Sequence, residues 1–160
     1  YYEMNEVGYN YRISDINCAL GLSQLKKIEG FKKERGDIVR RYDELFHNFP
    51  IVTPAKKSAC SDTCFHLYVV HIDFESLKMS RAELMEALRA KGIGTQVHYI
   101  PLYKQPYYKK LYGDISLQGS EKYYKGCLTL PLFVGLTRDD QSLISNTIKN
   151  IVEKKHVSLT

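Results

Sequence analysis

The fold is decided by residues 8–50, which read GYNYRISDINCALGLSQLKKIEGFKKERGDIVRRYDELFHNFP. Apolar side chains recur mostly at steps of three or four from Ile16 to Phe49, which is the spacing of one helical face. Ser14 is a good N-cap residue and Pro50 stops a helix, so we expect a helix between them. Unbroken, about 35 residues at roughly 1.5 Å each would make a rod of about 50 Å.

This rod is too long for a globule of 160 residues, whose expected radius of gyration is only about 15 Å. Either the helix breaks at Gly30 or Gly36, where glycine costs about 1 kcal/mol relative to alanine, or it lies against protein outside this sequence. We favour the second alternative. The chain also does not begin with methionine, so we expect it to be a piece of a longer protein.

Composition limits the class of protein. A chain of 160 residues with 44% hydrophobic and 26% charged side chains is expected to form one soluble domain with a buried core. No apolar run is long enough to predict a membrane helix. The net charge of +5 would suit an anionic ligand, but the charges are spread along the chain and give little support for nucleic acid as a partner. Four cysteines are too few for a disulfide scaffold, so we expect a reducing compartment, the cytoplasm.

Beyond residue 50 the pattern predicts a small α/β layer, in which a sheet of about three strands has helices packed against it. Residues 51–63 carry Pro54 and little apolar bulk, so we expect an exposed loop. Strands are expected where apolar and β-branched residues run together, at 65–72, 93–99 and 127–130. So small a sheet beside so long a helix indicates part of a larger structure.

The later helices are predicted from residues that favour helix ends. Ser80 and Glu83 form a capping box that begins a helix, and Gly92 supplies the left-handed residue at its end. Residues 101–113 are expected to be a tyrosine-rich loop with one helical turn. A short helix over 120–125 and a final helix from Thr137 follow. We therefore divide the chain into an interface loop with a linking helix, a small α/β domain and a frayed tail, at 1–50, 51–156 and 157–160.

Potential metal ligands follow one another in Cys60-x3-Cys64-x-His66-x4-His71. A structural zinc site usually has closer pairs such as C-x2-C, and His66 and His71 would point to opposite faces of one strand. We therefore interpret them as loop thiols beside strand histidines and expect no metal site. Motifs of hydrolases and of phosphate-binding nucleotide loops do not occur in the sequence.

Two stretches carry residues that suit a ligand. Asn10 and Arg12 precede the amino end of the first helix, where free N–H groups and the helix dipole favour a phosphate or carboxylate. His98, Tyr99 and Tyr103 lie at the expected end of a strand, where binding residues are common. Each stretch has an ordinary alternative: a surface turn with an exposed arginine for the first, and core packing of the tyrosines for the second. Spacing alone leaves both alternatives open.

Taken together, these stretches resemble the carboxyl-terminal part of the DegT/StrS family of sugar aminotransferases, which depend on pyridoxal 5'-phosphate (PLP). The resemblance covers residues 1–152 and includes Leu128-Thr129-Leu130-Pro131-Leu132. Its main motifs are Gly8-x-Asn10-x-Arg12 followed by a Gln-Leu helix, and Gln96-Val97-His98-Tyr99-x-Pro101. These two motifs look most like the branch of the family that aminates UDP-4-keto sugars in nonulosonic (pseudaminic) acid biosynthesis.

The resemblance implies a fold of two domains and a place for the cofactor. Members are fold-type I enzymes, in which a large amino-terminal domain holds PLP and its Schiff-base lysine, and a small carboxyl-terminal domain packs behind it. That lysine would lie upstream of Gly8, so no lysine of this chain is expected to be catalytic and the chain alone is expected to be inactive. The long helix would join the two domains, which explains its length.

The resemblance also implies partners and site residues. Members are homodimers with shared sites, and the asparagine at the position of Asn10 reaches the phosphate of the PLP bound in the other subunit. The enzyme takes an amino group from glutamate and gives it to a 4-keto nucleotide sugar. The substrate entrance would be lined by Arg12, His98, Tyr99 and Tyr103. Tyr103 departs from the family, which often has histidine there.

A second hypothesis is a non-enzymatic module, a small basic α/β domain that binds a protein partner or stacks its tyrosines on single-stranded nucleic acid. The chain has thirteen tyrosines and no tryptophan. Many of them cluster beside Asn10 and Pro101, and they do not alternate with lysine or arginine along a strand. This arrangement favours the enzyme.

Overall fold

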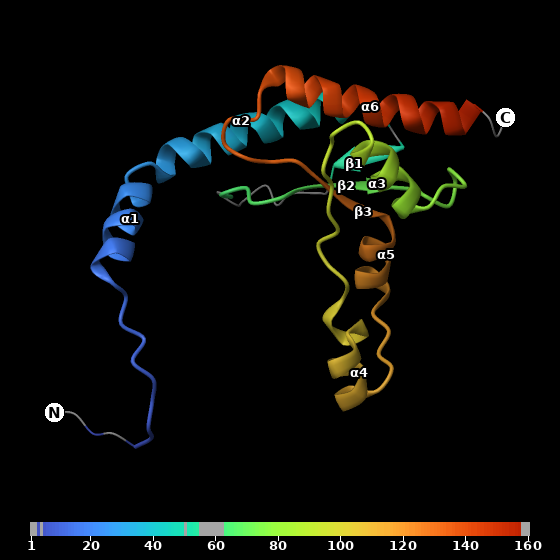
Figure 1. Ribbon diagram of the computed structural model, residues 1–160. Helices are drawn as coiled ribbons and strands as arrows, with labels where there is room; N and C mark the ends of the chain where they lie inside the picture. The colour runs from blue at the N-terminus through green and yellow to red at the C-terminus, as the bar shows by residue number, and fades with distance from the viewer. Residues whose placement is uncertain (1–2, 4, 50, 55–62, 158–160) are drawn as a thin grey trace.

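The structure is a computed structural model, and it describes residues 3, 5–49, 51–54 and 63–157. Figure 1 shows a body in which two helices, α2 and α6, lie over a small sheet, and two arms that extend from it. The first arm carries α1 and the second carries α4. The helices are α1 Asp15–Leu25, α2 Ile28–Phe46, α3 Arg81–Arg89, α4 Pro106–Tyr112, α5 Gln118–Gly126 and α6 Arg138–Val157, with a 3-10 turn, η1, at Leu102–Lys104. The strands are β1 Val52–Pro54, β2 Tyr68–Ile72 and β3 Cys127–Leu130.

The expected unbroken helix is two helices, so that prediction was wrong. α1 ends at Leu25 and α2 begins at Ile28. Between them the Lys27 N–H donates to the Gln24 carbonyl at 2.9 Å, three residues back, which tightens the turn. Leu25 and Ile28 are both exposed, so neither side chain is part of the buried core formed by the described residues. Both glycines proposed as break points lie inside α2, and whether α1 lies against further protein stays a prediction.

The first helix begins as predicted. The Asn17 N–H donates to Ser14 Oγ at 3.4 Å, so Ser14 is the N-cap of α1. α1 buries none of its residues, whereas α2 buries Ile38, Val39, Tyr42 and Phe46 against the body. The body therefore fixes α2, and α1 extends from it as an arm (Figure 1).

The sheet has three strands among the described residues, in the antiparallel order β1-β2-β3. The predictions for β2 and β3 are confirmed, with β2 shorter than expected. The predicted strand at 93–99 was wrong, because only Gln96 pairs with Thr129, as an isolated bridge, before the chain leaves the sheet. The third strand is instead β1, within a segment expected to be a loop. β1 pairs with β2 at the opposite edge of the sheet, and its Val52 is fully buried in the core. Residues 55–62 of that expected loop lie outside the described residues.

Short helices and caps follow the local signals closely. The Glu83 N–H donates to Ser80 Oγ at 3.1 Å, and Glu83 accepts from the Ser80 N–H at 2.6 Å, which is the predicted capping box. These hydrogen bonds hold the pKa of the Glu83 carboxyl below its usual value. Thr137 and Asp140 cap α6 in the same way, and α5 includes the predicted 120–125. The second arm is more helical than predicted, and residues 158–160 of the expected frayed tail lie outside the described residues.

The core lies between the sheet and helices α2, α3 and α6, and Tyr42 is at its centre. The Tyr42 side chain is 0% exposed, and its ring stacks on Tyr68 and Phe46 with centroid distances of 4.7 and 6.2 Å. Its hydroxyl donates to the Pro131 carbonyl at 3.2 Å. Burial raises the pKa of the Tyr42 hydroxyl, and the Asp140 carboxylate raises it further. This core fixes α2 and β3, from which the arms extend.

Arg35 ties α2 to two other segments, and we expect its removal to destabilise the fold. One of its Nη atoms lies 3.2, 3.3 and 3.5 Å from the carbonyl oxygens of Phe65, Leu132 and His66. Arg35→Ala is expected to lower the free energy of unfolding by about 1.5–3 kcal/mol, because carbonyls that are partly buried lose a charged donor. Urea denaturation measures this loss.

The matched control is Arg89→Ala. Arg89 is an exposed helical arginine whose Nη lies 3.7 Å from Glu86, so its removal is expected to cost less than about 1 kcal/mol. Equal losses in the two variants would contradict the structural role of Arg35.

Candidate functional site

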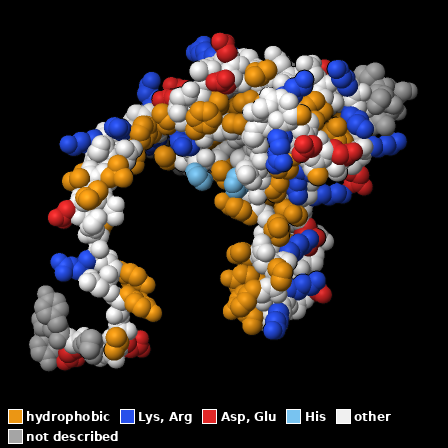
Figure 2. All heavy atoms as spheres, viewed as in Figure 1, with side chains coloured by type: hydrophobic (Ala, Val, Ile, Leu, Met, Phe, Trp, Pro, Cys, Tyr) orange, Lys and Arg blue, Asp and Glu red, His pale blue; other side chains and the backbone are white. Residues whose placement is uncertain are grey.

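The two arms face one another across an open hollow below the body. Figure 2 shows hydrophobic side chains on both arms, including the inner side of the second arm and of the lower part of the first, and histidine side chains at the top of the hollow. Exposed apolar side chains on contiguous surface mark sites of interaction or ligand binding. The exposed large apolar side chains include Val7, Tyr9, Tyr11, Ile16, Leu20 and Leu25 on the first arm, and Tyr99, Leu102, Tyr107, Leu111 and Tyr112 on the second arm.

Asn10 and Arg12 lie on the first arm, in an extended segment that leads into α1. Both side chains are exposed, and neither has a hydrogen-bond partner within the described ranges. Two residues later the N-terminus of α1 adds backbone N–H groups, although Asp15 in its first turn adds an opposing charge. An amide, a guanidinium and a helix N-terminus are all donors, so this set fits a phosphate group.

His98 is held in place by the sheet. Its Nδ1 lies 2.9 Å from the Oγ1 of buried Thr129, in the middle of β3. The backbones of Gln96 and Thr129 exchange hydrogen bonds of 2.8 and 3.1 Å, which fixes the segment just before His98. The Tyr99 ring packs edge-on against the imidazole at a centroid distance of 4.5 Å. One ring nitrogen is thus anchored, and the other has no partner among the residues described, so it is available to a ligand.

Tyr99 and Tyr103 line one cavity of about 510 Å³ at the base of the second arm. Its other walls include Pro101 from the loop and Ser120 and Tyr123 from α5. The Tyr103 hydroxyl is buried and has no hydrogen-bond partner in the described part of the chain. A buried hydroxyl left unpaired costs about 1–3 kcal/mol, so a ligand or water that pairs with it is favoured. Neither tyrosine belongs to the hydrophobic core.

The structure brings some of the predicted residues together and keeps others apart. His98, Tyr99 and Tyr103 share one region at the base of the second arm. Asn10 and Arg12 lie in the extended segment of the first arm, on the other side of the hollow that Figure 2 shows. Sequence reasoning missed Thr129, the partner of His98, and the contribution of α5 to the cavity. Thr129 and α5 lie far along the sequence from His98 and Tyr103, so no local sequence signal could have predicted these contacts.

The described residues hold no group of three His, Cys, Asp or Glu side chains able to bind a metal ion. Cys60, of the metal-like pattern, lies outside them. Within the described ranges, no helix has the length and apolar character needed to span a membrane.

The chain is similar to known proteins over most of its length. A family model described as the DegT/DnrJ/EryC1/StrS aminotransferase family matches residues 1–149. A Campylobacter jejuni protein named UDP-4-amino-4,6-dideoxy-N-acetyl-beta-L-altrosamine transaminase is 38% identical over 152 residues, which cover 95% of this chain and 40% of that protein. The chain therefore spans well under half the length of this relative.

Solved aminotransferase structures share the fold of this chain. Helicobacter pylori PseC, an aminotransferase involved in the biosynthesis of pseudoaminic acid, superposes with a TM-score of 0.86 at 29% identity, over 95% of this chain and 41% of PseC. The PLP form of the putative sugar aminotransferase Spr1654 from Streptococcus pneumoniae gives a TM-score of 0.84 at 29% identity, over 97% of this chain and 40% of Spr1654. The described fold is thus shared with part of larger aminotransferases.

Proposed function

We propose a function from one premise: this chain belongs to the DegT/DnrJ/EryC1/StrS aminotransferase family, whose model matches residues 1–149. The full-length protein is a PLP-dependent transaminase that moves an amino group from glutamate to a 4-keto nucleotide sugar. Its product serves nonulosonic acid or cell-surface polysaccharide biosynthesis. This chain is the carboxyl-terminal part of that enzyme, which works as a homodimer in the cytoplasm. The 38% identity to a named nucleotide-sugar transaminase is the observation that carries this proposal.

The first arm contributes to the cofactor site. PLP, when bound, supplies the electron sink for amino transfer. The Asn10 amide donates to its phosphate in the partner subunit, and the positive N-terminus of α1 adds to the field there. The exposure of Asn10 on an arm that extends away from the body supports a role in another subunit.

The second arm contributes to the substrate entrance. The Tyr103 hydroxyl is buried and unpaired within the described region, which suits a sugar hydroxyl or a phosphate oxygen. The Tyr99 ring offers a flat apolar surface beside it, and His98 is oriented by Thr129. Arg12 attracts the negatively charged nucleotide from the opposite arm. These residues bind and orient the substrate, and the chain by itself is inactive because the catalytic lysine belongs to the remaining part of the enzyme.

The hypothesis of a nucleic-acid-binding module is not supported. Both named solved structures are described as aminotransferases, and the family model covers both arms. The exposed tyrosines are explained equally well by contacts with the rest of an aminotransferase.

Amino transfer by the full-length protein tests the proposal. With PLP, glutamate and a UDP-4-keto sugar, we expect 2-oxoglutarate to be released and mass spectrometry to find the 4-amino sugar. A sugar that carries a hydroxyl in place of the 4-keto group should stay unchanged, because it offers no carbonyl to the amine. Failure to aminate keto sugars with any amino acid as donor would contradict the proposal.

A further inference from the structure

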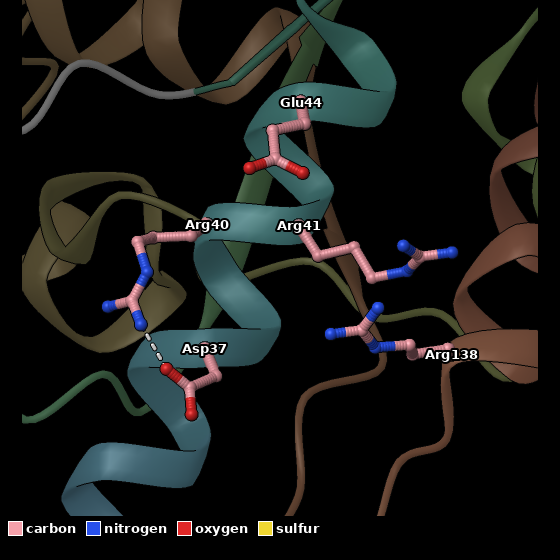
Figure 3. Close-up of a pocket in the computed structure, with 5 residues that line it drawn as sticks. All are labelled: Asp37, Arg40, Arg41, Glu44 and Arg138. Carbon is pink, nitrogen blue, oxygen red and sulfur yellow. Dashed lines mark hydrogen bonds and ion pairs between the residues drawn. The ribbon is translucent and has the colours of Figure 1, made fainter.

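A pocket of about 320 Å³ lies between α2 and the first turn of α6, on the helices that lie over the sheet. It is lined by charged residues alone: Asp37, Arg40, Arg41, Glu44 and Arg138 (Figure 3). None of these residues belongs to the candidate site on the two arms. The pocket thus gathers three guanidinium groups against two carboxylates.

One arginine and one carboxylate of the pocket already neutralise each other. The Arg40 guanidinium contacts the Asp37 carboxylate directly, as the dashed line in Figure 3 shows. Lys33 also lies 3.6 Å from Asp37, so this carboxylate is shared between two cations. Glu44 forms no ion pair with an arginine in the described region and is itself exposed. The charged groups of the lining that form no ion pair in the described region are therefore Glu44, Arg41 and Arg138, and the two guanidinium groups exceed the single carboxylate.

Arg41 and Arg138 come from different helices and point into the same space (Figure 3). One Nη of Arg41 donates to Ser142 Oγ at 3.1 Å, and that hydroxyl donates to the Arg138 carbonyl at 2.9 Å. The Nε of Arg41 is buried and has no hydrogen-bond partner among the described residues. The Arg138 guanidinium has no ion pair or hydrogen bond in that same part of the chain.

This arrangement is costly as it stands. A buried N–H without an acceptor loses its hydration and gains nothing in return, and the penalty is larger when the group is charged. Two guanidinium groups in one pocket also repel each other. An anion with several acceptor atoms would relieve both effects, since guanidinium forks match the oxygen geometry of phosphate and carboxylate.

We propose that Arg41 and Arg138 form a binding site for a small phosphate-type anion between α2 and α6. The anion accepts hydrogen bonds from both guanidinium groups and so joins the two helices that lie over the sheet. Ser142 keeps Arg41 in place for this contact through its hydroxyl. Binding at this site stabilises the body and involves no residue of either arm.

Titration with inorganic phosphate tests the site in the full-length protein. PLP is added to saturation so that the cofactor phosphate site does not contribute, and chloride keeps the ionic strength constant. Calorimetry should find phosphate binding that Arg138→Ala weakens by about tenfold or more, because a hydrogen bond to a charged group is lost. Arg41→Lys keeps the charge and removes the fork, and it should weaken binding by about tenfold for the same reason.

The control is Arg89→Ala, which removes an exposed arginine on α3 that is paired with Glu86. It should leave phosphate affinity unchanged. The proposal is overturned if the wild-type protein does not bind phosphate, if Arg138→Ala binds it equally well, or if Arg89→Ala weakens binding as much. Arg138 is exposed, so Arg138→Ala should fold. This variant therefore tests the proposal even if Arg41→Lys fails to fold.

Discussion

Asn10→Ala in the full-length protein is expected to weaken PLP binding by about ten- to a hundredfold. A hydrogen bond to a charged group is worth roughly 1.5–3 kcal/mol, and about 1.4 kcal/mol corresponds to tenfold in affinity. Asn10 is exposed and has no partner in the described part of this chain, so its loss should not disturb the fold. Titration with PLP measures the change. Asn146→Ala, which removes an exposed asparagine on α6, serves as the control and should leave PLP affinity unchanged.

A mixing experiment shows whether Asn10 acts in the partner subunit. One variant carries Asn10→Ala and keeps its catalytic lysine, and the other keeps Asn10 and has that lysine replaced. In a hybrid dimer the lysine of the first subunit meets Asn10 of the second, which completes one normal site. At limiting PLP, activity after joint dissociation and reassociation should exceed the sum of the separate samples. If mass spectrometry finds hybrids and activity does not rise, Asn10 does not serve a site in the other subunit.

Tyr42→Ala is expected to lower the free energy of unfolding by about 3–5 kcal/mol. Tyr42 is 0% exposed and stacks on Tyr68 and Phe46, so its removal leaves a cavity at the centre of the core. A typical domain is stable by only about 5–15 kcal/mol, so this variant loses much of its stability. The midpoint and slope of urea denaturation measure the loss.

Tyr42→Phe separates the ring from the hydroxyl. It removes only the hydrogen bond to Pro131, which is expected to cost about 0.5–1.5 kcal/mol. If the alanine and phenylalanine variants lose the same amount, ring packing at this position is not what holds α2 to the sheet.

Local signals predicted the parts of the fold whose partners are close in sequence. The capping box of Ser80 with Glu83 was readable because it pairs residues three positions apart, and Thr137 marked the start of the final helix. β1 was missed because it is three residues long and includes a proline, so only its pairing with β2 makes it a strand. The segment 93–99 has strand-like residues, yet Tyr99 is 67% exposed and the chain leaves the sheet after one bridge.

The candidate site was predictable where a motif carried it. Asn10, Arg12, His98, Tyr99 and Tyr103 were singled out by their places before a helix and at the end of an expected strand, and the resemblance to a family gave them roles, which stay predictions. The anchoring of His98 by Thr129 spans 31 positions, and the contact of Arg41 with Ser142 spans 101. Neither leaves a periodic or local signal, because each depends on how the helices and strands pack. The charged pocket between α2 and α6 was therefore invisible in the sequence.

Reductive labelling tests the central claim most directly, namely that this chain supplies phosphate and substrate contacts to a PLP enzyme whose lysine lies elsewhere. The full-length protein is saturated with PLP, reduced with borohydride, digested and mapped by mass spectrometry. We expect one stoichiometrically labelled lysine upstream of Gly8 and no such label on any lysine of residues 1–160. A fully labelled lysine within this chain, or no labelled lysine at all, would contradict the account.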